Sequence, residues 1–418
     1  MTKNILKTVL RWLSILILWK YQPLIIAITG SVGKTAAKEA VFAVASIKAR
    51  TRKSYGNYNN EIGVPLTIIG CISPGRKFFA WLWIFAKGVF IFLFPAKYPK
   101  ILVVEMGADR PGDIEYLTSF VKPAVSVVTA VGPSHLENFS KMDHIILEKS
   151  NLVRVLRGGT AVLNYDDPAV RQMAAKHKGK TTFYGLDSRA DIAASDIIYK
   201  PQGIIFKARY SGNTVPIELT GVLGEPSVYA ALAAAACGIV LGLNLVEIGR
   251  ALGIYRTLPG RLRLLSGIKS TTIIDDTYNS SPASAIAALE ILSLLPAQRR
   301  IAILGDMAEL GEATEQGHRE VGRAVAERKI DIFVVVGPKS KFSGDEARLA
   351  GYAGGQILEF ENSDEARIPV QNLIRPGDMI LVKGSQAARM EKIVKEIMAE
   401  PERAGKLLCR QSGTWLDT

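Results

Sequence analysis

The sequence predicts an α/β protein built from two mostly parallel sheets, each covered by helices. Short apolar segments of strand length alternate with longer segments of helical periodicity along most of the chain. A glycine-rich loop directly follows an apolar segment near the N-terminus, and a second series of strands and helices begins near Leu258-Pro259-Gly260. A chain of 418 residues is too long for one hydrophobic core, which also favours at least two domains.

The composition is that of a globular protein with a large positive charge. Hydrophobic residues make up 48% of the chain and charged residues 22%. Cys71, Cys237 and Cys409 lie far apart without the spacing of a metal site, so we expect a reduced, cytoplasmic setting. The net charge is +13, but no motif interleaves basic and aromatic residues as nucleic-acid-binding proteins do. Anionic small molecules and a membrane surface are therefore the expected partners, and nucleic acid is not.

Two apolar segments predict peripheral contact with the inner face of the plasma membrane. Residues 5–19 are expected to form an amphipathic helix that carries Lys7 and Arg11 and is short for a membrane span. Residues 78–94 form a second apolar segment with Lys87 near its middle. In the chain this segment lies between the phosphate loop and an acidic strand end, which are predicted to form one nucleotide site. A single membrane crossing by the segment would place these two parts on opposite sides of the membrane. The alternative is that the two segments pack on each other or on the domain.

The loop Thr29-Gly30-Ser31-Val32-Gly33-Lys34-Thr35 predicts a phosphate site. It stands between the strand predicted at 24–28 and a helix predicted at 35–49, an order that presents backbone N–H groups to phosphates. Lys34 is expected to reach the outer phosphates, and the Thr35 hydroxyl to bind Mg²⁺. Ile28 stands where the common spacing has glycine, so the loop is a shorter variant. A strand-to-helix turn that contains Gly and Lys by chance is the alternative.

The other elements follow in chain order and divide the chain into three parts. An apolar, basic N-terminal segment suited to membrane contact is expected over 1–22, a central P-loop ATPase-like sheet domain over 23–256, and a C-terminal Rossmann-like α/β domain over 257–418. Short antiparallel strands are expected over 184–222. The remaining predicted strands are 101–105, 125–129, 161–164, 272–275, 301–305, 332–336 and 379–382, and the helices are 143–155, 227–241, 283–294 and 315–328.

Polar residues at the ends of strands in the central domain are candidates for metal binding and catalysis. Glu105 ends a predicted strand and points to the crevice where α/β sheets bind ligands, so it is expected to hold Mg²⁺ directly or through water. His135 follows the next strand by a short loop and is a candidate for a second metal ion. Lys149 lies on the helix after it. Taken singly, each of these residues is more often solvated or structural.

Further polar segments predict substrate contacts. The loop that contains Asn57, Asn59 and Asn60 suits a polar, anionic substrate, although a plain surface turn is the alternative. In the C-terminal domain three strands end in polar residues, which favours a binding face. These strand ends contain Asp275-Asp276-Thr277-Tyr278-Asn279, Gly305-Asp306-Met307-Ala308-Glu309-Leu310-Gly311 and Lys383-Gly384-Ser385.

Taken together, these motifs resemble those of the Mur ligases, ATP-dependent enzymes that form amide bonds in peptidoglycan synthesis. The resemblance covers about residues 23–398 and is greatest to the members that join D-alanyl-D-alanine to a UDP-muramoyl-tripeptide. It implies a substrate carboxylate that takes the γ-phosphate of ATP and an amine that then attacks the acyl phosphate. The segments that carry it are 57–67, 105–113, 135–139, 258–262, 275–281, 305–311 with His318, and 383–391.

The resemblance also implies roles for individual residues. Glu105, His135 and Thr35 match metal-binding positions, and Lys149 matches a lysine that is carbamylated in these enzymes and then supports a second Mg²⁺. The expected catalytic residues are Lys34, Glu105, His135 and Lys149. The expected ATP contacts are Gly30, Ser31, Gly33, Lys34, Thr35, Arg261, Asp275 and Asn279, and the expected substrate contacts are Asn57, Asn59, Asn60, Asp306, Glu309 and Lys383.

The sequence departs from the family pattern in two places. Only about two dozen residues precede the phosphate loop, too few for the family's N-terminal UDP-binding domain, and Pro226-Ser227 replace a His-Asn pair near the nucleotide. Two alternatives therefore stand beside the UDP-linked substrate. One is a Mur-type ligase that acts on a lipid-linked or other acceptor, and the other is a membrane-associated ATP-binding protein without activity. The protein is expected to be monomeric, cytoplasmic and active on small peptidoglycan precursors.

Overall fold

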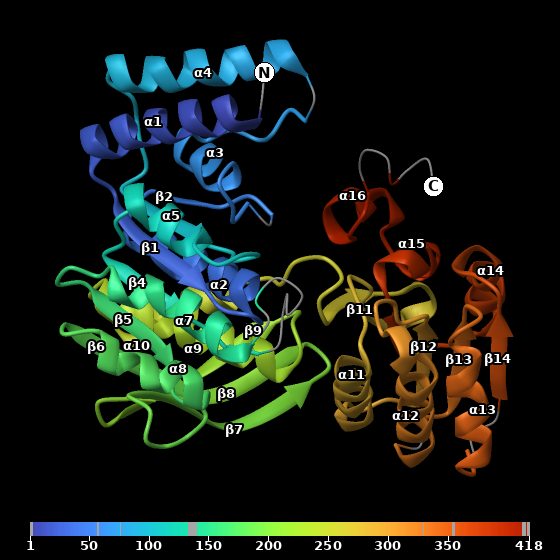
Figure 1. The fold of residues 1–418 in the computed structure, drawn as a ribbon. Helices are drawn as coiled ribbons and strands as arrows, with labels where there is room; N and C mark the ends of the chain where they lie inside the picture. The colour runs from blue at the N-terminus through green and yellow to red at the C-terminus, as the bar shows by residue number, and fades with distance from the viewer. Residues whose placement is uncertain are drawn as a thin grey trace. The chain divides into compact units, whose positions relative to one another are not determined.

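The computed structural model describes residues 3–56, 58–75, 77–132, 139, 141–328, 330–352, 356–411 and 415. They form two compact units. The first comprises Met1–Ile197, Phe206–Glu218 and Glu225–Tyr255, and the second comprises Ile198–Ile205, Leu219–Gly224 and Arg256–Thr418. Strands and helices alternate in both, which confirms the predicted α/β class (Figure 1).

A nine-stranded sheet runs through the first unit in the order β2-β3-β1-β4-β5-β6-β7-β8-β9. Neighbouring strands from β2 to β7 pair in parallel. Two-residue turns join β7 to β8 and β8 to β9, which makes these neighbours antiparallel, as predicted for this region. The strands are β1 Leu24–Thr29, β2 Thr51–Lys53, β3 Ile101–Glu105, β4 Val125–Val128, β5 Thr160–Asn164, β6 Lys180–Gly185, β7 Ile192–Lys200, β8 Gly203–Tyr210 and β9 Asn213–Thr220.

Helices cover this sheet, and the central strands are buried along their whole length. Helix α2 follows the phosphate loop and packs against α9, an alanine-rich helix whose small side chains allow close approach. The helices are α1 Lys3–Tyr21, α2 Lys34–Lys48, α3 Gly63–Ile69, α4 Phe78–Leu93, α5 Asp113–Phe120, α7 Met142–Arg154, α8 Pro168–Gln172, α9 Glu225–Val240 and α10 Leu245–Gly253, with the 3₁₀ turn η1 Met173–Lys176.

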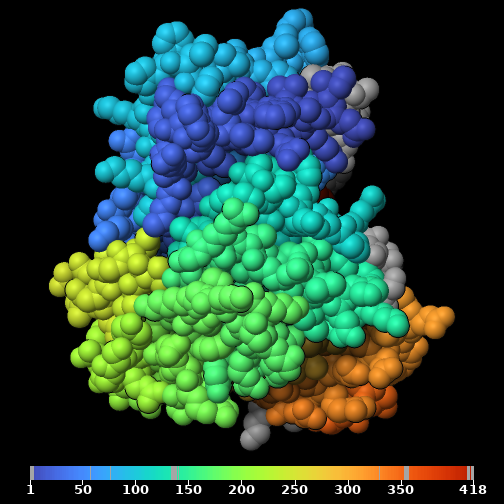
Figure 2. Space-filling model, turned by 60° about the vertical axis from the view of Figure 1, so that its left-hand side comes forward, coloured from blue at the N-terminus to red at the C-terminus, as the bar shows by residue number. Residues whose placement is uncertain are grey.

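The two apolar segments form α1 and α4, which pack side by side at one flank of the first unit (Figures 1 and 2). Helix α1 lies between α4 and α3, so α4 is the outer layer. Within the described part of the chain, neither these helices nor any other combines the length and the apolarity that a membrane crossing requires.

The second unit contains a six-stranded sheet in the order β10-β11-β15-β12-β13-β14. All neighbours pair in parallel except β10, which is antiparallel to β11. The strands are β10 Arg263–Ser266, β11 Thr272–Asp276, β12 Arg299–Gly305, β13 Ile332–Val336, β14 Gln356–Phe360 and β15 Asp378–Lys383. The helices are α11 Pro282–Leu294, α12 Thr314–Glu327, α13 Lys341–Leu349, α14 Ser363–Leu373, α15 Glu391–Ile397 and α16 Ala404–Leu407, with the 3₁₀ turns η2 Ile268–Ser270, η3 Gly311–Ala313, η4 Gln386–Ala388 and η5 Pro401–Arg403.

Four strands lie wholly or mostly outside the predicted set. One of them, β6, lies inside the first sheet and pairs in parallel with β5 and β7, and the other three lie at sheet edges. Strand β2 has only the sequence Thr-Arg-Lys, and β10 and β14 close the two sides of the second sheet. Edge strands have a neighbour on one side only, and short or polar sequences are favoured there because they limit pairing with other chains. Such sequences lack the continuous apolar pattern by which the central strands were predicted.

Helices α12 and α13 provide a test of this packing. A Cβ atom at Gly322 of α12 would overlap the carbonyl oxygen of Ser343 on α13, whereas a Cβ at Gly344 would lie at an ordinary 3.4 Å from its nearest neighbour. We expect Gly322→Ala to lower the stability of the second unit by about 2 kcal/mol, because a backbone atom cannot move aside cheaply. Gly344→Ala, the matched control, is expected to be neutral or to add up to about 1 kcal/mol through helix propensity. Urea unfolding of both variants measures this, and equal stabilities would contradict the packing described.

Candidate active site

The phosphate loop lies at the carboxyl ends of β1, β3 and β4, three neighbouring parallel strands. Gly30 and Gly33 have φ of 148° and 84°, a region that other residues adopt only with strain. A Cβ at Gly30 would also overlap Thr129 Oγ1, so the loop passes close to the end of β4. Thr29 Oγ1 donates to the Met106 carbonyl at 2.8 Å and ties this loop to the one after β3. The glycines are therefore required by the backbone path.

Two lysines converge on one carbonyl oxygen of this loop. Lys34 Nζ donates to Gly30 O at 2.8 Å, and Lys149 Nζ on α7 donates to the same oxygen at 3.0 Å. Burial lowers the pKa of both ammonium groups, and burial together with charge repulsion from Lys34 lowers the pKa of Lys149 to about 8. Glu148, the residue beside Lys149, accepts instead from the N–H groups of Gly112 and Ile114. Among the described residues no carboxylate pairs with Lys149, so the two cations form a site for an anion.

Glu105 supplies the negative charge nearest to the loop. It pairs with Ile28 in the register of β3 and β1 and is 1% exposed. Oε1 accepts from Asn59 Nδ2 at 3.1 Å, whereas Oε2 accepts no hydrogen bond from the described residues. Leaving a buried carboxylate oxygen without a donor is costly, so this atom is available to a ligand.

Lys38 is a residue of this site that the sequence analysis missed. Its Nζ lies 3.6 Å from Glu105 Oε2 and donates to the Gly56 carbonyl at 2.5 Å, and its side chain is fully buried. Lys38 follows Lys34 by four residues in α2, the spacing that places two side chains on one helix face. That spacing was the only feature of the sequence that could have identified Lys38. A lysine in a helix is usually solvated, so its residue type alone does not indicate a buried site.

The donor set of the loop fits Mg²⁺ better than a softer metal. Thr35, at the first turn of α2, and Glu105 Oε2, which accepts no hydrogen bond from the described residues, are hard ligands. Mg²⁺ commonly takes one or two protein oxygens together with phosphates and water. Within the described ranges no group of three or more His, Cys, Asp or Glu side chains could hold a metal on its own. His135 and Asn57, two of the predicted site residues, lie outside the described residues.

The polar loop before α3 has distinct uses for its two described amides. Asn59 contacts Glu105, whereas Asn60 Oδ1 accepts from the N–H groups of Ile62 and Gly63 at 3.2 and 2.9 Å. Asn60 therefore shapes the entry to α3. Glu61 of this loop pairs with Lys7 of α1 at 2.7 Å, which joins the loop to the N-terminal helix.

At the strand ends of the second unit, Lys383 is buried and fully engaged. Its Nζ donates to Asp276 Oδ2 at 2.6 Å and to the Asn279 carbonyl at 2.9 Å. The side chain of Asn279 is exposed, and its Oδ1 accepts from Ser280 N–H. The guanidinium of Arg261 lies over the Tyr278 ring, 4.1 Å from its centroid. Lys383 thus holds the loop that carries Tyr278 and Asn279, and Arg261 stacks on that loop.

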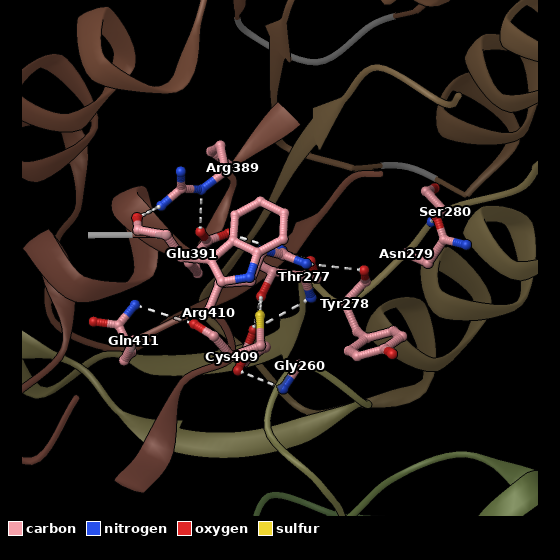
Figure 3. A network of polar contacts seen from close by, with 12 residues as sticks. Gly260, Thr277, Tyr278, Asn279, Ser280, Arg389, Glu391, Cys409, Arg410 and Gln411 are labelled. Carbon is pink, nitrogen blue, oxygen red and sulfur yellow. Dashed lines mark hydrogen bonds and ion pairs between the residues drawn. The ribbon is translucent and has the colours of Figure 1, made fainter. Parts of the chain in front are cut away.

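The C-terminal segment anchors the same loop (Figure 3). Arg410 donates to the carbonyls of Thr277 and Tyr278 and to Glu391, which is buried and also pairs with Arg389. Cys409 Sγ lies 3.4 Å from Thr277 Oγ1, which donates to Asp275 Oδ1 at 2.6 Å. The predicted site residue Asp275 is therefore enclosed by a network of contacts from its own unit.

Asp306 and Glu309 lie on the loop after β12. Asp306 Oδ1 accepts from the N–H and hydroxyl of Ser340 and lines a hollow with Gly337, Asp364 and Lys392, whereas Glu309 is exposed in the left-handed region at φ 65°. His318 of α12 holds this loop in place by a hydrogen bond to its backbone. Its Nε2 accepts from Met307 N–H at 3.1 Å, Nδ1 contacts the Thr314 carbonyl at 2.7 Å, and burial lowers its pKa. The imidazole is therefore a neutral support for the loop.

The first unit thus brings together Lys34, Lys149, Glu105 and Asn59, and the second places Arg261, Asn279 and Lys383 at one loop. Pro226 and Ser227 form the first turn of α9, after Gly224 with φ 84°. Their effect on nucleotide binding stays a prediction.

A phosphate loop between a parallel strand and a helix, with a second mostly parallel α/β unit in the same chain, defines a nucleotide-binding class of α/β protein. Residues 89–238 match the Mur ligase middle domain, and residues 260–386 match the Mur ligase, glutamate ligase domain. The chain belongs to the Mur ligase family, as the sequence motifs indicated.

Curated relatives and solved structures agree with this assignment. UDP-N-acetylmuramoyl-tripeptide–D-alanyl-D-alanine ligase of Synechocystis is 30% identical over 90% of this chain and 75% of its own length, and that of Bacillus subtilis is 28% identical over 90% and 76%. MurF from Acinetobacter baumannii superposes with a TM-score of 0.78 at 28% identity, over 93% of this chain and 79% of its own. MurF ligase from Thermotoga maritima in complex with ADP gives 0.75 at 25%, over 96% and 86%.

The environment of Asp275 predicts a pH-dependent stability. Complete burial raises the pKa of this carboxyl to about 6, against the hydrogen bonds from Thr277 and Gly260 that lower it. The folded state then binds a proton more readily than the unfolded state between about pH 4 and 6, so the wild type loses stability as pH rises through this window. Asp275→Asn removes the titrating carboxyl, so we expect the variant to lack this loss. The free energy of unfolding of the variant, relative to that of the wild type, should therefore rise by on the order of 3 kcal/mol from pH 4 to pH 7.

Urea unfolding at several pH values measures the difference. Exposed Glu312→Gln controls for the loss of one carboxylate. A difference between Asp275→Asn and wild type that does not vary with pH would contradict the buried environment.

Proposed function

We propose that this protein is an ATP-dependent ligase that joins D-alanyl-D-alanine to UDP-N-acetylmuramoyl-tripeptide through an acyl phosphate. The observation that carries the proposal is the convergence of Lys34 and Lys149 on Gly30 O, together with a buried Glu105 oxygen that accepts no hydrogen bond from the described residues. This arrangement suits a triphosphate and a hard cation. Relatives that align over 90% of this chain carry the name of this ligase. ATP use is further supported by the related ligase complexed with ADP.

In this proposal the first unit stabilises phosphoryl transfer by charge. The N–H groups of Gly30 and Gly33 and the N-terminus of α2 would face the phosphates, and Lys34 would leave Gly30 O to pair with the outer ones. The Ser31 N–H donates to the Ala130 carbonyl at 2.6 Å, so Ser31 would contact ATP only after this bond opens. Thr35, Glu105 and His135 would hold Mg²⁺, which neutralises phosphate charge when bound. Asn59 and Lys38 fix the Glu105 carboxylate.

Lys149 is proposed to react with CO₂. The amine adds to the carbon of CO₂ and loses a proton, giving a carbamate with one negative charge. The lowered pKa favours this reaction because only the neutral amine is a nucleophile. A carbamate beside Lys34 replaces repulsion between two cations by an ion pair and supplies a further oxygen ligand for a second Mg²⁺.

The remaining site residues are proposed as contacts without a defined geometry. Arg261, Asp275 and Asn279 are our candidates for ATP, and Asn57, Asn59, Asn60, Asp306, Glu309 and Lys383 for the two substrates. Lys383 and Asn60 would act by shaping their loops, because their polar atoms are already engaged. We also propose that the enzyme is a cytoplasmic monomer that contacts the membrane peripherally and no nucleic acid.

The reaction is tested with purified protein, Mg²⁺-ATP and bicarbonate. UDP-N-acetylmuramoyl-tripeptide and D-alanyl-D-alanine are added singly and together, and ADP and the UDP-pentapeptide are measured. ADP release and product are expected only with both substrates, and Lys34→Met should abolish both. Intact ATP binding without product would overturn the substrate assignment, and lipid-linked acceptors would then be tested.

Replacing Lys149 tests the carbamate. We expect Lys149→Ala to lower kcat about 1,000-fold, because an anionic group in the site is lost. A short carboxylate such as propionate fits the cavity that this leaves and should restore part of the rate. Lys149→Arg leaves no such cavity and cannot form a carbamate, so it serves as the matched control without rescue. Equal activity of Lys149→Arg and wild type would contradict the proposal.

A further inference from the structure

Helix α4 is apolar on all sides except for Lys87, although it forms the outer layer of its unit. Its inner side chains, Trp81, Ile84 and Ile91, are buried. Its outer face contains no charged or polar side chain. Helices that are hydrophobic all round are normally enclosed by protein or lipid, so an outer helix of this kind requires a covering. The exposed side chains of that face are Phe79, Leu82, Trp83, Val89, Phe90 and Leu93.

The helix is firmly held by its neighbour. Gly88 brings α4 close to Leu13 of α1, because a Cβ there would lie only 3.0 Å from a Leu13 methyl. Lys20 at the end of α1 donates to the carbonyls of Ile91 and Phe92, which are left open at the end of α4. The exposed face is therefore part of an ordered helical pair.

Helix α1 contributes two large aromatic side chains of its own. Trp12 and Trp19 are 59% and 71% exposed. Tryptophan prefers the boundary between hydrocarbon and water, because its ring is apolar and its N–H is polar. Figure 2 shows α1 and α4 together on one side of the unit.

The charges near this face have one sign. Neither residues 1–22 nor residues 71–100 contain Asp or Glu. Lys77 precedes α4 directly, and Lys97 and Lys100 follow it, and all three are exposed. The one charged residue within α4, Lys87, turns its ammonium back to the Gly70 carbonyl at 2.7 Å and keeps the outer face apolar. A second copy of this face would bring like charges together, whereas an anionic surface would pair with them.

We propose that α1 and α4 dock this protein in the plane of an anionic lipid bilayer, with the outer face of α4 among the acyl chains. The inference deepens the peripheral membrane contact of the proposed function by naming its surface and its lipid class. Helix α4 is preceded by α3, which packs against β3, and is followed by β3 itself, so both of its connections lead to one side of the same sheet, which fits a helix lying in the interface. Lys7 of α1 pairs with Glu61, so docking places the loop of Asn59 and Asn60 close to the lipid surface.

Vesicle binding tests the surface. Four of the five tryptophans, Trp12, Trp19, Trp81 and Trp83, belong to α1 and α4, so intrinsic fluorescence reports on this region. We expect the protein to sediment with phosphatidylglycerol-containing vesicles, with a blue shift and quenching by brominated acyl chains. Binding should fall with salt and be much weaker to pure phosphatidylcholine.

A face variant and a matched control locate the contact. The face variant Leu82→Gln/Phe90→Gln/Leu93→Gln is expected to bind about 100-fold more weakly. The control Ile254→Gln/Leu294→Gln/Leu349→Gln changes three apolar side chains that are on average more exposed and lie outside α1 and α4, and it should bind like wild type. Lys97→Gln/Lys100→Gln should weaken binding about five-fold per lysine and reduce its salt dependence.

Each result decides the proposal. Wild type that stays in the supernatant, or a face variant that binds like wild type, would overturn it. A wild-type dimer that the face variant converts to a monomer, without vesicle binding, would assign the face to a second copy instead. Ligase activity without vesicles is measured in parallel and should be unchanged in the face variant. A failure of the ligase reaction is thereby distinguished from a failure of membrane docking.

Discussion

Repulsion between two buried ammonium groups at one carbonyl oxygen is the constraint on which the first unit depends. Lys34 and Lys149 reach Gly30 O from α2 and α7, and no described carboxylate pairs with Lys149. Holding two cations together in a buried site costs folding free energy, so the surrounding structure must enforce the geometry. Gly30 permits the turn, Thr129 limits the path of the loop, and Glu148 fixes α7 against α5 by accepting from two N–H groups. The site is thus built to be completed by negative charge, and ATP or a carbamate on Lys149 would relieve the same repulsion.

The second unit uses buried charge in the opposite manner, because its buried Lys383 and Glu391 each have a partner of opposite charge within the unit. Lys383 pairs with Asp276, and Glu391 pairs with both Arg389 and Arg410. These pairs fix the backbone of residues 277–279 from two sides, and Arg261 then stacks on Tyr278 at its surface. Buried ion pairs contribute little net stability, but they specify one arrangement of the groups that they join. The second unit thereby holds the exposed Arg261 and Asn279 in fixed positions. The first unit instead supplies the positive charges of Lys34 and Lys149.

Prediction from sequence succeeded where a local pattern determines the structure. The phosphate loop, the central strands and Glu105 at the end of β3 are each encoded in a few adjacent residues, and their positions follow from strand–loop–helix order. The role of Lys38 could not be deduced in this way, because its burial depends on Glu105 and Gly56, which are remote in sequence. The same holds for His318, which supports the loop after β12 through Met307, and for Arg410 near the C-terminus. Edge strands β2, β10 and β14 were missed because a strand with one neighbour needs little apolar sequence.

The apolarity of α4 was visible in the sequence, but its meaning depends on topology. A run of sixteen residues with one lysine is compatible with a buried helix, a re-entrant segment or an interfacial helix. The structure packs one face of α4 on α1. The chain enters α4 from α3, which packs against β3, and leaves it into β3, a strand of the sheet that holds the phosphate loop. A buried helix would need a second layer over Phe79, Trp83 and Phe90, which are among the more exposed aromatic side chains described. An interfacial position supplies that layer as lipid and leaves β1 and β3 on one side of the membrane, as one nucleotide site requires.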